Sequence, residues 1–563
     1  MTDLAAATPP ASSPAAPTLD AATIDAATID AATIDAAGLR TLLGDGGEYA
    51  LVDVRESGVT AEQGSILLAV SIPLSILERR VGALVPRRST PVITYDGGEG
   101  ELAGRAAARL GELGYTDVRV LDGGLAAWAA AGHKVHSGGD HVIGQAFGEW
   151  IEEIYTTPHI SVPEFLERRA AGEDIVLLDS RPIGEFTNHS LPGGTSIPGA
   201  ELVYRAAEVV SSPDSLVVVN CAGRTRSILG AQVLINAGLP NRVVSLEGGT
   251  QSWVLEGHEL DHGRQAQAPL PTGPALDAAK AAGDRFRERF GIRRIDAATL
   301  ASFGADDTRS LYVLDVRTPE EFAAGHRPGS RSAPSWEVAP WVFRYVGTHH
   351  SRVVLVDNDG VRATVAASWI AQFGWAEVFV LEGGLDGVEL ETGPVAATDD
   401  LGLPTGGPRS ITPGEVHDAP AGSVLVLDVA PSPEYRAGHL PGARFAIRAR
   451  LAASVGQLPG TGPIVVTSTD GVLARYAAAD LAAVTDREVQ VLDGGTDAWR
   501  AAGLPVETDQ VAWLHEPNDV VSSGWREIDL EARKAGFRRY LAWELGLVAE
   551  LDQDDTVPFA TFA

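Results

Sequence analysis

Hydrophobic and polar positions between residues 161 and 247 alternate between two kinds of segment. Short apolar runs with the length and composition of buried strands lie at 175–179, 215–220 and 242–247. Residues 227–237 have a helical pattern, and Ser161 with Glu164 is a capping-box signature for an earlier helix. Strands that alternate with helices pair in parallel through right-handed crossovers. The pattern therefore predicts an α/β fold, a mostly parallel sheet with helices on both faces.

A strand that ends in aspartate recurs along the chain, and each copy is followed by an apolar run that ends in Gly-Gly. The aspartates are Asp53, Asp179, Asp315 and Asp428, and the first glycines are Gly123, Gly248, Gly383 and Gly494. The intervals of 70, 69, 68 and 66 residues predict four tandem copies of one domain. Three copies have a tryptophan four residues after the second glycine, whereas the third has a valine. These residues, predicted to pack in the core, are Trp128, Trp253 and Trp499, with Val388 in the third copy.

The repeats predict the domain organisation of the chain. The predicted segments are a disordered, low-complexity N-terminus at 1–30, domains at 31–137, 138–262, 285–396 and 409–508, and a helical tail at 509–563. Three copies of Ala-Ala-Thr-Ile-Asp between Ala21 and Asp35 are interpreted as a linker or frayed helix. Apolar residues between Trp525 and Leu551 have mostly helical spacing. This tail is expected to pack on the body of the protein or on a second subunit of a homo-oligomer.

Length and charge narrow the classes of function. With roughly 150 residues for a typical domain, 563 residues agree with four domains. The formal net charge of −31 repels phosphate backbones and anionic lipids, so neither nucleic acid nor a membrane is an expected partner. No run approaches the roughly 18 apolar residues of a membrane span, and a cytoplasmic location is expected.

Cys221 is the single cysteine, so an intramolecular disulfide and a zinc site of cysteine pairs are excluded. It lies between the strand that ends at Asn220 and the next helix, in the sequence Cys221, Ala222, Gly223, Arg224, Thr225, Arg226 and Ser227. Free amides at a helix N-terminus and two arginines favour an anion and are expected to lower the pKa of the thiol. The loop therefore predicts an activated cysteine that faces an anionic substrate.

The Asp-x-Arg strand end, the cysteine loop and the closing Gly-Gly-x-x-x-Trp resemble the rhodanese domain of sulfurtransferases. The resemblance implies that Cys221 accepts sulfur from thiosulfate or a similar small anionic donor and passes it to a thiol or to cyanide. It also implies that the amides of Ala222 to Arg226 cradle the persulfide and that Arg224 and Arg226 hold the donor's sulfonate. Residues Ala222 to Ser227 are therefore expected to bind the substrate. Asp179 and Arg181 are expected to brace the loop. No metal and no cofactor are expected.

The other copies depart from this pattern. Aspartate, aspartate and serine stand at the cysteine position, as Asp96, Asp357 and Ser468, and none of them accepts sulfane sulfur. These copies are predicted to be catalytically silent. By analogy with two-domain rhodaneses, copies one and two are expected to form the working unit, and copies three and four an extra pair. His189 is given no catalytic role, and Glu185 stands where larger members often have a substrate-binding arginine.

Two other functions stay open. Phosphatases and arsenate reductases of related fold use a cysteine loop that is one residue longer before its arginine, whereas Arg226 lies five residues after Cys221. This shorter loop favours sulfur chemistry. The second alternative is a persulfide carrier or sulfide sensor, in which the silent copies are docking surfaces and sulfur passes to one partner without rapid turnover.

Overall fold

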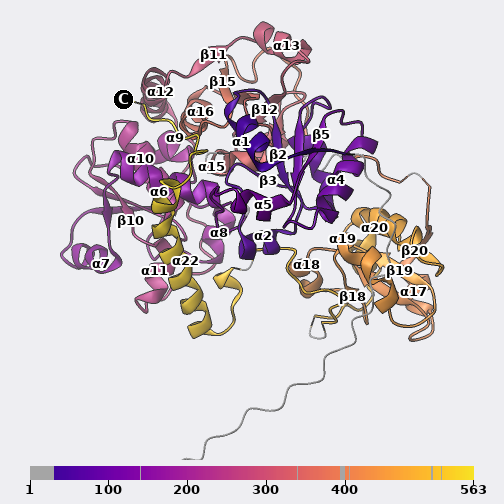
Figure 1. The fold of residues 1–563 in the computed structure, drawn as a ribbon. Coiled ribbons are helices and arrows are strands. Elements are labelled where there is room, and N and C mark those ends of the chain that lie inside the picture. Colours follow the sequence, from indigo (N-terminus) through magenta and orange to yellow (C-terminus); the bar gives the residue numbers. More distant parts are fainter. Residues whose placement is uncertain are drawn as a thin grey trace, which may run out of the picture.

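The computed structural model describes residues 31–139, 141–338, 340–393, 400–404, 406–508, 511–521 and 523–562. The segment 1–30, predicted to be disordered, lies outside the described residues. The described chain contains four five-stranded sheets with parallel pairing throughout, and helices flank each sheet (Figure 1). The predicted α/β class is confirmed.

All four sheets share one strand order, in which the strand before the functional loop is central. The orders are β1-β5-β4-β2-β3, β6-β10-β9-β7-β8, β11-β15-β14-β12-β13 and β16-β20-β19-β17-β18. The strands are β1 Ala32–Ile34, β2 Ala50–Asp53, β3 Val70–Ser71, β4 Val92–Tyr95, β5 Val118–Leu121, β6 His159–Ile160, β7 Ile175–Asp179, β8 Thr195–Ser196, β9 Leu216–Asn220, β10 Val243–Leu246, β11 Arg293–Ile295, β12 Leu311–Asp315, β13 Arg331–Ser332, β14 Arg352–Val356, β15 Glu377–Leu381, β16 Arg409–Ile411, β17 Leu425–Asp428, β18 Arg444–Phe445, β19 Ile464–Thr467 and β20 Val489–Leu492. The central strands are buried apolar runs, as sheets covered on both faces require.

Helices connect the strands and cover the sheets. In the first two domains they are α1 Ala36–Gly44, α2 Ser57–Gln63, α3 Leu77–Leu84, α4 Glu101–Glu112, α5 Gly124–Ala130, α6 Val142–Tyr155, α7 Val162–Ala170, α8 Ile183–Asn188, α9 Glu201–Arg205, α10 Thr225–Asn236 and α11 Gly249–Leu255. The remaining helices are α12 Gly273–Phe290, α13 Ala297–Ala305, α14 Pro319–Ala324, α15 Ser335–Val338, α16 Val361–Phe373, α17 Pro413–Asp418, α18 Ser432–Ala437, α19 Arg448–Leu451, α20 Val472–Ala482, α21 Gly495–Ala501 and α22 Leu530–Leu551. Short 3₁₀ turns lie at Leu74–Ile76, Ala206–Glu208, Val342–Arg344, Ala452–Gln457 and Gly524–Arg526.

The first strand of domain one corrects the interpretation of the Ala-Ala-Thr-Ile-Asp repeat. Within the last repeat, β1 pairs in parallel with β5, and Asp35 caps α1 by accepting a hydrogen bond from the Gly38 amide at 2.7 Å. The same position caps the first helix of the other domains, through Ser161, Asp296 and Thr412. The segment from Ala31 to Asp35 is therefore part of the fold and neither a linker nor a frayed helix.

The Gly-Gly signature lets the closing turn approach the functional loop of each domain. Gly249 has a φ of +50°, and a Cβ there would lie 2.1 Å from the Cys221 carbonyl oxygen. A Cβ on the second glycine of the other domains would also lie too close to the matching carbonyl oxygen, at 2.6 Å for Gly124, 1.9 Å for Gly384 and 2.1 Å for Gly495. Three domains continue into a helix whose tryptophan is buried, at Trp128, Trp253 and Trp499. The predicted core packing of these tryptophans is confirmed.

Domain three packs on domains one and two, and domain four on domain one (Figure 1). Tyr312 donates a hydrogen bond to the Leu84 carbonyl of domain one at 2.5 Å, and Arg362 forms an ion pair with Glu201 of domain two at 2.9 Å. Arg448 of domain four forms an ion pair with the buried Glu78 of domain one at 2.6 Å. The expected pairing of copies three and four is therefore wrong, because each of them is docked on an earlier domain.

Candidate active site

The cysteine loop lies at the carboxyl end of β9, in the centre of the second sheet. Cys221 directly follows β9 and is 2% exposed, and α10 begins at Thr225. The N-terminus of α11 supports the loop from behind, since the amide of Thr250 donates to the Cys221 carbonyl at 2.9 Å and that of Gln251 to the Ala222 carbonyl at 3.0 Å. The thiol contacts the Ser227 hydroxyl, with the sulfur and oxygen 3.6 Å apart. The sequence thus located the thiol correctly between strand and helix.

The Asp179–Arg181 pair lies beside the loop. Both side chains are fully buried, and the Arg181 guanidinium donates two hydrogen bonds, of 2.9 and 2.6 Å, to the Asp179 carboxylate. The Asn220 amide group donates to the same carboxylate at 3.2 Å, which links the pair to the residue before Cys221. His189 contacts Arg181 at 3.0 Å and stacks on Trp525, and burial lowers the pKa of His189 to about 4. A neutral imidazole in this position packs and orients Arg181.

Arg224 is held by carboxylates of α6. Its guanidinium donates to both Glu149 oxygens, at 2.8 and 2.9 Å, and to Glu152. Burial raises the pKa of Glu149, while the charge of Arg224 opposes that rise. In this closed arrangement the Arg224 guanidinium is bound to Glu149 and Glu152, so a donor anion has to compete with these two carboxylates for it.

Arg226 is paired with Glu185 through two hydrogen bonds of 2.7 and 2.8 Å. Its guanidinium also lies 5.5 Å from the ring centre of Trp341 in domain three. A small cavity beside Arg226 is lined on one side by Trp336, Pro340 and Trp369, also of domain three. Domain three therefore completes this side of the site, and the expectation that domains one and two form the working unit stays a prediction.

The C-terminal helix α22 covers the other side of the loop. It lies along α6 and α11 in Figure 1 and places Glu544, which is fully buried, on the rim of the loop. The Thr225 and Tyr540 hydroxyls each donate to Glu544 Oε1 at 3.0 Å. A Cβ on Gly223 would lie 3.1 Å from Glu544 Oε2. Sequence reasoning missed Glu544; its helical spacing from Tyr540 and Leu547 is the one signal that places it on the buried face.

The direction in which the pKa of the thiol shifts differs from the expectation. Burial raises the pKa of Cys221 and so does the charge of Glu544, whereas Arg226 and the Ser227 hydrogen bonds lower it. The expected net lowering is therefore wrong for the closed site, because α6, domain three and α22 exclude water from the loop. Two effects oppose thiolate formation. Opening the site to water removes the effect of burial, and neutralising Glu544 removes the effect of its charge.

Domains one and three show what the loop amides bind. In domain three the Asp357 carboxylate accepts from the amides of Gly360 at 2.6 Å and Ala363 at 3.0 Å. In domain one Asp96 accepts from the amides of three residues, Gly98, Gly100 and Ala103. The carboxylate occupies the loop's own anion nest in both domains. Domain two has the same loop position without a carboxylate, which leaves its nest for an external anion.

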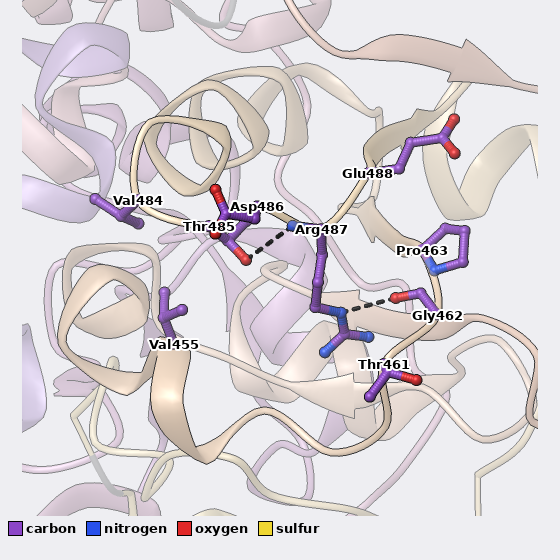
Figure 2. Close-up of a pocket in the computed structure, with 9 residues that line it drawn as sticks. All are labelled: Val455, Thr461, Gly462, Pro463, Val484, Thr485, Asp486, Arg487 and Glu488. Carbon is purple, nitrogen blue, oxygen red and sulfur yellow. Dashed lines mark hydrogen bonds between the residues drawn. The ribbon is translucent and has the colours of Figure 1, made fainter.

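Other hollows of the molecule are not lined by Cys221 or its loop. An open hollow of about 570 Å³ lies in domain four, and among its lining residues the Arg487 guanidinium donates to the Gly462 carbonyl at 2.7 Å (Figure 2). Its lining residues precede β19 and β20, so it lies at the amino ends of these strands. Ligands of parallel sheets gather at the carboxyl ends. Among the described residues, no group of three His, Cys, Asp or Glu side chains is arranged to hold a metal ion.

Comparison with known proteins identifies the family. The rhodanese-like domain matches residues 35–131, 161–256, 298–391 and 412–502. The chain belongs to the rhodanese family. The crystal structure of a thiosulfate sulfurtransferase from Pseudomonas aeruginosa is 41% identical to it, covers 94% of this chain and all of that one, and superposes with a TM-score of 0.88.

Curated relatives match shorter stretches of this rhodanese. An HTH-type transcriptional regulator of Mycobacterium tuberculosis is 40% identical over 115 residues, which are 20% of this chain and 50% of the regulator. The thiosulfate sulfurtransferase GlpE of Pseudoalteromonas translucida is 30% identical over 78 residues, which are 14% of this chain and 72% of GlpE. This chain therefore spans only half of the first relative, and these matches concern single domains. No helix in the described part of the chain has the length and apolar character of a membrane span.

Proposed function

We propose that this rhodanese-type sulfurtransferase takes sulfane sulfur from thiosulfate, holds it as a persulfide on Cys221 and passes it to a small thiol. Family membership and the 41% identity to a thiosulfate sulfurtransferase over 94% of the chain support sulfur transfer as the activity. The observation that carries the assignment of the site is the cysteine at the anion nest that carboxylates fill in domains one and three. Cytoplasmic residence stays a prediction from the sequence.

The first half-reaction follows from the loop. The Cys221 thiolate attacks the outer sulfur of thiosulfate, the new S–S bond forms, the bond between the two thiosulfate sulfurs breaks, and sulfite leaves with that electron pair. Loop amides between Ala222 and Ser227 stabilise the negative outer sulfur of the persulfide, as the matching amides hold Asp357 in domain three. Arg224 and Arg226 bind the sulfonate oxygens after exchanging their carboxylate partners for the donor.

The second half-reaction returns the thiolate. An acceptor thiol attacks the outer sulfur, and the bond to the Cys221 sulfur breaks, so no external oxidant or reductant is consumed. Asp179 and Arg181 hold the loop through Asn220 and take no part in bond making. Donor and acceptor react in separate steps at one sulfur atom, which predicts ping-pong kinetics.

The test is sulfur transfer from thiosulfate to cyanide by the purified full chain and by Cys221→Ser, with intact mass recorded after thiosulfate alone. The wild type is expected to turn over and to gain one sulfur, which sulfite or a thiol removes. The variant is expected to do neither, with an unchanged circular dichroism spectrum. A wild type without an adduct, or a variant that keeps turnover, overturns the proposal.

Burial of the site favours a persulfide carrier as the second candidate. Cys221 is 2% exposed beneath elements of domain three and α22, an arrangement that suits delivery to one partner able to open it. A carrier loads one sulfur from thiosulfate but turns over slowly with small thiols. Single-turnover loading with slow multiple turnover therefore distinguishes this function from the enzyme.

A further inference from the structure

The carboxyl of Glu544 differs from the other acids around the cysteine loop. Glu149 is held by Arg224 and Glu185 by Arg226, each through two close hydrogen bonds. Glu544 has no arginine within ion-pair distance among the described residues. Its Oε1 is fixed by hydroxyls, whereas its buried Oε2 accepts no hydrogen bond from any described residue. A fully buried acceptor left without a donor is costly, which marks a place where a further group binds.

Oε2 is directed at the loop that carries the sulfur. It lies 3.1 Å from the point where a Cβ on Gly223 would stand, so the carboxyl packs directly against the loop. The charges of Glu544 and Cys221 influence each other, because Glu544 raises the pKa of the thiol. The free oxygen therefore lies against the loop whose cysteine carries the persulfide in the function proposed above.

We propose that Glu544, supplied by the C-terminal helix α22, takes the proton from the acceptor thiol in the second half-reaction. This proposal rests on the function proposed above. The thiol gives its proton to Oε2, its sulfur forms a bond to the outer sulfur of the Cys221 persulfide, and the bond from that sulfur to Cys221 breaks with its electron pair left on the cysteine. The released persulfide then receives the proton from Glu544, which restores the carboxylate.

The surroundings of Glu544 suit a proton acceptor at neutral pH. Burial and the neighbouring charge of Glu149 raise the pKa of Glu544 to about 7, against the hydrogen bonds from Tyr540 and Thr225 and the charge of Arg224. The packed helix α11, Gly249–Leu255, has no ionisable side chain. A base with a pKa near the operating pH combines an ionised fraction with adequate basicity. His189 cannot replace it, since its pKa of about 4 makes it a weak base.

The experiment measures the two half-reactions separately in the full chain and in Glu544→Gln. Glutamine keeps the shape and still accepts from Thr225 and Tyr540, but it cannot take a proton. Each protein is loaded with thiosulfate, and loss of the sulfur is followed by rapid quench and intact mass. The acceptors are the monothiol N-acetylcysteine and, as a matched control, sulfite at pH 8.5. Sulfite has no proton to give up there, and it removes the sulfur by reversing the loading step.

Glu544→Gln is expected to load and to discharge to sulfite at least as fast as the wild type, because the charge that raises the pKa of Cys221 is gone, while discharge to the thiol at pH 7 falls roughly 100-fold. The wild-type rate with the thiol is expected to rise with pH through about 7, as Glu544 ionises. In the variant this rise moves up toward the ionisation of the thiol itself. Glu544→Asp, which keeps a carboxylate on a shorter side chain, is expected to restore part of the rise near neutral pH.

Three outcomes overturn the role of Glu544. They are an unchanged rate with the thiol in Glu544→Gln, an equal loss with thiol and sulfite, which indicates a structural role, and faster discharge to both, which indicates that the helix only blocks the site. Failure of the wild type to form the adduct is different, because it overturns the Cys221 persulfide on which this proposal depends.

Discussion

The loops of domains two and three have the same position in the same fold and opposite uses. In domain three the loop begins with Asp357, whose carboxylate accepts two of the loop's own amides, and Gly360 precedes the helix with a φ of +80°. In domain two it begins with Cys221, and Arg224 precedes the helix with a φ of −117°. In domain three the loop amides bind the loop's own carboxylate. In domain two no carboxylate of the loop occupies the matching amides.

The arginine five residues after the loop's first residue shows the same contrast. Arg362 pairs with Glu321, as Arg226 pairs with Glu185 in domain two, but it also binds Glu201 of domain two and is fully buried. The loop of domain three is thus part of the contact between domains two and three. The docked domain in turn supplies Trp341 to the site of its neighbour.

The largest effect is expected from Cys221→Asp, which gives domain two the first loop residue of domain three. The new carboxylate is expected to accept the amides at Arg224 and Ser227, which match those that hold Asp357. Thiosulfate should then leave no sulfur adduct by intact mass, and turnover should vanish. The thermal unfolding midpoint should be at least that of Cys221→Ser, and a lower one would show that the nest does not accept a carboxylate.

Arg362→Met tests the docking role of the silent loop. Removing one partner of a buried ion pair leaves Glu201 and Glu321 without their cation, and a loss of about 3–5 kcal/mol in unfolding free energy is expected. Urea unfolding followed by tryptophan fluorescence measures it. Arg226→Met is the matched control: its partner Glu185 is 42% exposed, so a loss of only about 1 kcal/mol is expected. Equal losses would contradict the difference between the two arginines.

Glu185→Gln is expected to give the smallest effect and sharpens the role of Arg226. The variant removes the negative charge that competes with the donor for the guanidinium. The KM for thiosulfate should fall about fivefold, equivalent to ~1 kcal/mol, with little change in kcat. Steady-state kinetics at several thiosulfate concentrations measure this change. Glu321→Gln, the equivalent change in domain three, should leave KM unchanged, and a rise of KM in Glu185→Gln would show that Glu185 orients Arg226 for the donor.

Local pattern was enough to predict the repeated fold and the position of the thiol. Strand ends such as Asp179, the glycine pairs and the loop from Cys221 to Ser227 recur at fixed spacing, and each depends on contacts within one domain. The repeat of Ala-Ala-Thr-Ile-Asp was misinterpreted, because its final copy forms β1 only by pairing with β5, 87 residues further along the chain.

The sequence by itself determined four α/β domains, one nucleophile and three loops without one, because these follow from periodicity and residue chemistry. Only the tertiary structure decided what surrounds the thiol: carboxylates that hold its arginines, tryptophans from domain three, and Glu544 from a helix 319 positions away from Thr225. Burial by those distant elements also reversed the expected direction of the Cys221 pKa. Contacts between residues so far apart depend on how whole domains dock, and no local spacing in the chain encodes that.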